Sequence, residues 1–126
     1  MRGIYISATL LVIVLLVALF YMLAIFNVSN NFASIAIAIE QDIALDSMSD
    51  AGDKIEEIDQ MWRRNGKWIA IFVNHSEMEE IQYIIERMKT YIESNDKSTL
   101  KADLAEFKER IKHLPLMEQP TVENVL

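Results

Sequence analysis

The sequence predicts an all-α protein: an N-terminal transmembrane helix that continues into an antiparallel up-down helical bundle. Two observations predict this class. Residues 4–26 form one apolar run without a charge, Pro or Gly. Most of the rest of the 126-residue chain repeats apolar residues every three or four positions, the period of an amphipathic helix. Alternation of apolar and polar residues, the pattern of a half-buried strand, does not compete with this period.

The apolar run is long enough to cross a bilayer. At a rise of about 1.5 Å per residue it measures roughly 34 Å as a helix, and the hydrocarbon core of a bilayer is about 30 Å thick. A cleaved signal peptide is the competing interpretation, but its apolar region is roughly 7–15 residues long and is followed by small residues. The residues after Phe26, beginning Asn27-Val28-Ser29, offer no good cleavage site. We therefore expect residues 4–26 to lie in the lipid bilayer.

Basic residues predict the orientation. Arg2 precedes the run, and no Lys or Arg follows it until Lys54. Because basic flanks stay in the cytoplasm, we expect a single-pass protein of the cell membrane with its N-terminus inside. Residues 1–3 would form a cytoplasmic stub, residues 27–114 an extracytoplasmic bundle, and residues 115–126 a C-terminal tail.

Charge and composition exclude several classes of function. The formal net charge is −7, and without Arg2 the remainder carries −8. A surface this acidic argues against nucleic acid and against adhesion to anionic lipid headgroups. The chain has no Cys, which excludes disulfides, a thiol nucleophile and thiolate metal sites. About a hundred residues outside the span are enough to bury a core.

Four helical patterns follow one another. The first extends the membrane helix through Phe32, Ile35, Ile39 and Ile43 and should stop within residues 49–52, where Ser, Asp and Gly cluster. The second should begin at Asp53, with Glu56 completing a capping box. Its apolar stripe comprises Ile55, Ile58, Trp62, Ile69 and Phe72.

The third pattern begins with a Ser-x-x-Glu capping box at Ser76 and Glu79. Its stripe comprises Met78, Ile81, Ile85, Met88 and Ile92. The fourth should start with Asp96 or Ser98 as its N-cap and end at Pro115. Its stripe comprises Leu100, Leu104, Phe107, Ile111 and Leu114. Short connections between these helices predict antiparallel neighbours.

The two histidines are the groups whose ordinary pKa lies near neutral pH. His75 precedes the third helix and His113 closes the fourth, so a hairpin of the two would bring both to one end, close to Glu77. Two imidazoles and a carboxylate are suitable metal ligands, but the spacing matches no metal motif. A structural use at helix ends is the commoner role, so we predict no metal site and no cofactor.

Residues 61–68 form a basic and aromatic segment that contains Trp62, Arg63, Arg64 and Trp68. Trp and Arg dominate the energetics of protein interfaces, so this segment is a candidate for partner binding. In the other interpretation, Trp62 fills the core and the basic residues form a solvated face. No Ser-His-Asp set, phosphate-binding loop or catalytic carboxylate pair is evident, so we predict that the protein is not an enzyme.

From about Asp53 onward the chain resembles an uncharacterised family of small single-span membrane proteins from spore-forming Gram-positive bacteria, classed as a domain of unknown function. The residues that carry the resemblance are Trp62 and Trp68, then residues 75–81 (HSEMEEI), residues 88–93 (MKTYIE), residues 95–97 (NDK) and the ending at residues 123–126 (ENVL). Residues 50–54 depart from the family pattern, which often has an aromatic residue there. The resemblance implies no activity. It suggests an accessory role beside a larger membrane protein.

These observations favour a membrane-anchored, non-enzymatic protein whose outer domain binds another protein. The alternative is an extracytoplasmic domain that senses a ligand or cation at the end carrying His75 and His113. Self-association is a third interpretation, and it would require an apolar face that folding leaves exposed.

Overall fold

The computed structural model describes residues 1–116. Four α-helices and a short 3-10 helix follow one another: α1 (Arg2–Ala44), α2 (Met48–Ile69), α3 (His75–Glu93), α4 (Lys97–His113) and η1 (Leu114–Leu116). Within these residues the structure consists of helices and turns. Residues 117–126 lie outside the description, and with them most of the predicted tail and the ENVL ending.

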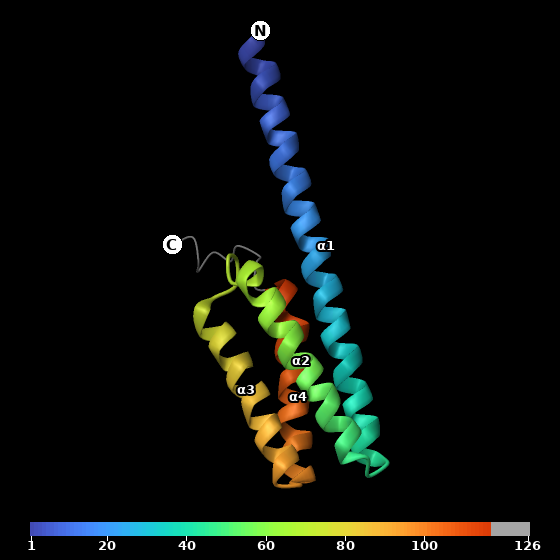
Figure 1. The fold of residues 1–126 in the computed structure, drawn as a ribbon. Helices are drawn as coiled ribbons and strands as arrows, with labels where there is room; N and C mark the ends of the chain where they lie inside the picture. Colours follow the sequence, from blue (N-terminus) through green and yellow to red (C-terminus); the bar gives the residue numbers. More distant parts are fainter. Residues whose placement is uncertain (117–126) are drawn as a thin grey trace.

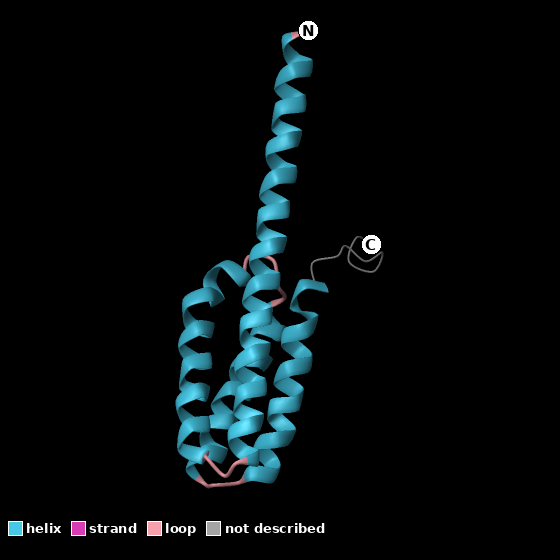
Figure 2. Ribbon diagram, turned by 90° about the vertical axis from the view of Figure 1, so that its right-hand side faces the viewer, coloured by secondary structure: helices cyan, strands magenta, loops and turns pink. Residues whose placement is uncertain are grey.

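The helices form an antiparallel four-helix bundle, as predicted (Figure 1). Each helix packs against the next, and α4 packs back against α1. Helix α1 is far longer than its neighbours, and its N-terminal half projects beyond the bundle (Figure 2). The predicted extension of the apolar helix into the bundle is confirmed, because α1 runs from Arg2 to Ala44 without a break.

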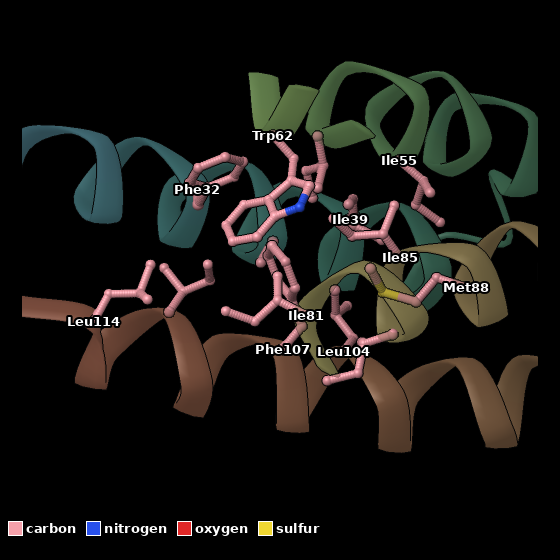
Figure 3. Packing of buried hydrophobic residues seen from close by; sticks show 14 of the residues in the cluster. Phe32, Ile39, Ile55, Trp62, Ile81, Ile85, Met88, Leu104, Phe107 and Leu114 are labelled. Atoms are coloured by element: carbon pink, nitrogen blue, oxygen red, sulfur yellow. The ribbon is translucent and has the colours of Figure 1, made fainter. Parts of the chain in front are cut away.

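The bundle core contains the predicted stripes (Figure 3). Phe32 of α1 is fully buried, and its ring lies 6.1 Å from the ring of Trp62 and 6.0 Å from that of Phe107. These edge-to-face contacts join three helices at one level. Fully buried residues of the other levels include Ile39, Ile58, Ile81, Ile85, Met88, Leu104 and Ile111.

The first turn lies earlier than the sequence pattern predicted. Helix α1 ends at Ala44 and α2 begins at Met48, so the predicted start at Asp53 was wrong. Asp46 adopts a left-handed conformation with φ of 60°. The N–H of Ser47 then donates to the carbonyl of Asp42 at 2.7 Å, which closes α1 in a Schellman motif. The buried Ala51 holds the additional first turn of α2 against the core.

The remaining turns agree with the prediction in part. Helix α3 begins at His75, and the side chain of Asn74 accepts from the N–H of Ser76 at 3.0 Å, so the predicted Ser76 cap was wrong. Helix α2 ends at Ile69, which leaves Phe72 outside the helix and 55% exposed rather than in its stripe. Asp96 is the N-cap of α4, as predicted, and accepts from the N–H of Thr99 at 3.2 Å.

Candidate functional site

The projecting half of α1 is the most distinctive surface of the molecule. Its side chains from Ile4 to Phe20 are exposed, as the bundle does not cover them, and apart from Ser7 and Thr9 they are apolar or aromatic. In the described part of the chain, α1 is the one helix long and apolar enough to cross a membrane, with a mean hydropathy of 3.0 in its most apolar window. An exposed apolar surface of this size is unfavourable in water, so it indicates a membrane span or signal anchor.

The bundle begins at Tyr21, inside the predicted span. The ring of Tyr21 lies 4.1 Å from the ring of Phe72 and 5.6 Å from that of Trp68. One turn later, Ile25 is fully buried. The last turns of the apolar run therefore contact the ends of the other helices instead of standing free.

A buried hydrogen bond joins α1 to α4, farther into the bundle than Tyr21. The hydroxyl of Ser29 is buried and donates to the carbonyl of Ile111 at 2.8 Å. That carbonyl belongs to the last turn of α4 and also accepts from the backbone N–H of Leu114, the C-cap residue. The contact gives α1 a defined register relative to the end of α4.

The basic and aromatic segment does not form one surface. Trp62 is buried in the core, as the second interpretation predicted, so a partner would not reach it in the folded bundle. Arg63 and Arg64 are exposed. Trp68 is half-buried beside Tyr21, and its indole N–H donates to the side-chain oxygen of Asn65 at 2.9 Å. Trp68 and the arginines thus have different surroundings.

Arg63 takes part in a charged cluster with Asp59 and Lys89. The carboxylate of Asp59 is buried between α2 and α3, 2.6 Å from the ammonium of Lys89 and 3.2 Å from Nε of Arg63. Burial by itself would raise the pKa of Asp59. The hydrogen bonds and charges of the two cations outweigh burial and hold the pKa of the carboxyl below its ordinary value. The cluster therefore joins α3 to α2 through an ionised group.

The structure places His75 and His113 at the same end of the bundle, at the start of α3 and the end of α4 (Figure 1). Each pairs with a carboxylate of its own helix: His75 with Glu79 and His113 with Glu109, both at 3.0 Å. Glu77 instead pairs with Arg110 of α4 at 3.0 Å. Among residues 1–116, no three His, Cys, Asp or Glu side chains form a group able to hold a metal ion.

A family comparison covers nearly all of this architecture. The model described as Domain of unknown function (DUF4363) matches residues 19–125. The chain belongs to the DUF4363 family. Comparison with curated proteins and with solved structures gave no match. The DUF4363 match starts two residues before Tyr21, so its first residue falls where α1 meets the bundle.

Sequence reasoning missed the aromatic cluster of Tyr21, Trp68 and Phe72, which this DUF4363 chain forms where α1 leaves the bundle. Tyr21 was counted as part of the span, and Phe72 as part of a helix stripe. The signal was present in residues 69–73, five apolar residues in succession that include all of the α2–α3 turn except its last residue, Asn74. Such a run is unusual for a turn between amphipathic helices, which normally carries polar residues.

Proposed function

We propose that this chain is a single-span membrane protein that acts as a non-enzymatic accessory subunit of a membrane complex. Residues 4–26 anchor it, and residues 27–114 form an interaction domain outside the cytoplasmic membrane. The family resemblance and the single basic residue before the span, Arg2, support this placement.

The observation that carries the proposal is the continuity of α1. One helix supplies both the exposed apolar segment and a quarter of the bundle core, including the buried Phe32 and Ile39. An anchor that only tethers a domain needs no fixed geometry, and a flexible linker serves that purpose. A continuous helix instead fixes the height and tilt of the domain relative to the bilayer. Such rigidity is useful to a subunit that must meet a neighbouring membrane protein in one orientation.

A groove beside α1 is the surface where we expect that neighbour. It runs from the span onto the bundle between α1 and α2. The lining residues are Val17, Phe20, Tyr21, Ala24, Asn27, Val28, Asn65 and Trp68. They are apolar on the membrane side and include two amides on the bundle side. A transmembrane helix of a partner matches this gradient, because its own polarity changes at the same level.

Site-specific photocrosslinking in intact membranes tests the proposal. A photoreactive residue replaces Val17 or Phe20 on the groove side, and Leu11 or Leu15 on the opposite side of the helix serves as the matched control. We expect one discrete adduct from the groove side and little from the control side. Adducts at twice the mass of the chain would support self-association instead. Absence of adducts from every position, with the chain present in the membrane fraction, would overturn the accessory role.

Protease treatment of right-side-out protoplasts tests the orientation. We expect digestion of the bundle from outside and protection of an epitope placed before Arg2. Digestion only after lysis would place the bundle in the cytoplasm.

A further inference from the structure

The turn between α2 and α3 is apolar and exposed. Ile71 is 71% exposed and Phe72 is 55% exposed, whereas Val73 beside them is buried. The turn between α3 and α4, at the opposite end of the bundle, consists of Ser94, Asn95 and Asp96. The two turns therefore face different surroundings, and the composition of the first is unfavourable in water.

The apolar turn lies at the end of the bundle from which the span projects (Figure 1). Its Phe72 ring contacts Tyr21 of α1 at a centroid distance of 4.1 Å. The exposed face of α1 stays apolar past this level, with Met22, Leu23 and Phe26 exposed. After Thr9, the next amide, hydroxyl-bearing aliphatic or charged residue on that helix is Asn27.

Helix length leaves no gap between the bilayer and this turn. Between Arg2 and Tyr21 lie 18 residues, which span about 27 Å at 1.5 Å each. A hydrocarbon core of about 30 Å is slightly thicker than this free segment, even when the helix is not tilted. Tilt shortens its reach further. With Arg2 at one surface, the outer boundary of the hydrocarbon falls at or beyond Tyr21.

We propose that the α2–α3 turn is a second membrane-contacting element, with the side chains of Ile71 and Phe72 inserted among the lipids beside the span. This inference rests on the proposed membrane anchoring. The partner is the phospholipid bilayer itself. The half-buried Trp68 and Tyr21 would lie at the interface, where their amphipathic rings are favoured. Burial of the turn in lipid removes its exposed apolar surface from water.

Two exposed cations lie at the same end of the bundle as the apolar turn. Lys67 lies in the last turn of α2 and Lys112 in the last turn of α4, both exposed and both at this end of the bundle. Long basic side chains can lay their stems along apolar surface while the ammonium reaches phosphate groups. The carboxylates of Glu77 and Glu80 at the same end face the guanidinium of Arg110, whereas Glu79 and Glu109 each pair with a histidine of their own helix. Cations and carboxylates are therefore mixed at this end, and Lys67 and Lys112 are available to the headgroup layer.

Spin labelling of the full chain in phosphatidylcholine–phosphatidylglycerol nanodiscs tests the proposal. The chain has no Cys, so single-cysteine variants take one nitroxide each. The test position is Ile71→Cys. Leu15→Cys is the reference inside the bilayer, and Ser98→Cys, exposed at the opposite end of the bundle, is the aqueous reference. The measurement is the ratio of collision rates with oxygen, which concentrates in lipid, and with a water-soluble nickel chelate.

We expect the ratio at position 71 to lie several-fold above that at position 98 and closer to that at position 15. A ratio at position 71 equal to that at position 98 would overturn the insertion while leaving the anchor intact. Low collision rates with both reagents, together with dipolar broadening, would also overturn it, because a second copy of the chain would then cover the turn. If the label at position 15 is water-accessible, the anchor itself fails, so the two proposals are separable.

Discussion

Replacement of Phe32 by Ala tests whether α1 belongs to the cooperative core or only leads the chain to it. Phe32 is fully buried and makes edge-to-face contacts with the rings of Trp62 and Phe107. Loss of a buried Phe side chain costs about 3–5 kcal/mol, including the cavity that remains. The bundle has little room to collapse around the site, because the two partner rings come from different helices. We therefore expect a loss of about 4 kcal/mol in the free energy of unfolding.

The assay is urea unfolding of the full chain in nanodiscs, followed by circular dichroism at 222 nm. The span stays helical in lipid, so the change in signal reports the bundle. With an m-value of about 2 kcal/mol per molar urea, the midpoint should fall by roughly 2 M. The matched control is Ile37→Ala on the same helix, because Ile37 is 48% exposed. This control should cost less than about 1 kcal/mol, since the helix propensity of Ala offsets part of the lost burial. Equal midpoints for the two variants would refute the view that α1 is part of the core.

The charged cluster and the glycines give two further predictions. Asp59→Asn at pH 7 should cost about 2 kcal/mol, because it leaves the ammonium of Lys89 with only the more distant carboxylate of Glu56, at 3.7 Å. The folded pKa of Asp59 is lowered, so its stabilising effect is present above the unfolded pKa near 4 and is lost as pH falls through the folded pKa. The difference between parent and variant should thus stay constant from pH 7 to about pH 5 and close below about pH 4; a difference independent of pH would contradict this. Gly66→Ala should raise stability by about 0.5–1 kcal/mol, because its Cβ would have only an ordinary contact at 4.0 Å. Gly52→Ala is the comparison: its Cβ would lie 3.2 Å from Cγ2 of Ile92, so the gain should be smaller or absent, as thermal melts can show.

The sequence predicted the helices better than their ends. Apolar stripes are spread over many residues, so no single error moves them, and Ile81, Ile85 and Leu104 are buried as expected. A helix end depends on one or two backbone angles. Asp46 and Asn95 take positive φ values of 60° and 55°, which residue type permits but does not require.

Local signals also competed at the helix ends. Asp53 is a good N-cap by type, yet it lies inside α2, because helix formation from Met48 lets Ala51 enter the core. Tertiary packing decided this case, and a single sequence does not contain that information in local form.

The cluster around Tyr21 was out of reach for a similar reason. Its members come from two helices and a turn, and residues 21 and 72 are far apart in the sequence. Residues 21 and 72 meet only if the stretch of α1 before the α1–α2 turn is about as long as the stretch of chain after it. The sequence pattern placed that turn several residues too late, so it did not predict the contact. The pairing of Asp59 with Lys89 depends on register in the same way.

The distribution of charge supports the proposed placement, in which the bundle stands upright on the membrane. The end remote from the span carries Asp46, Asp50 and Asp53 at the first turn, and Glu93 and Asp96 at the last. Lys54 and Lys97 at this end pair with Asp42 and Asp46, and the remaining carboxylates leave it acidic. Ala44 lies 23 positions after Tyr21 on helix α1, so at about 1.5 Å each this acidic end lies about 35 Å from the level of the apolar turn. Anionic headgroups repel acidic side chains within about a Debye length, roughly 8–10 Å. An acidic end beyond that range is repelled little by the headgroups. A bundle lying on its side would instead bring the same carboxylates to the membrane surface. The negative net charge that argues against membrane adhesion in the sequence thus favours one orientation once the helices are in place: apolar turn down, acidic turns away from the bilayer.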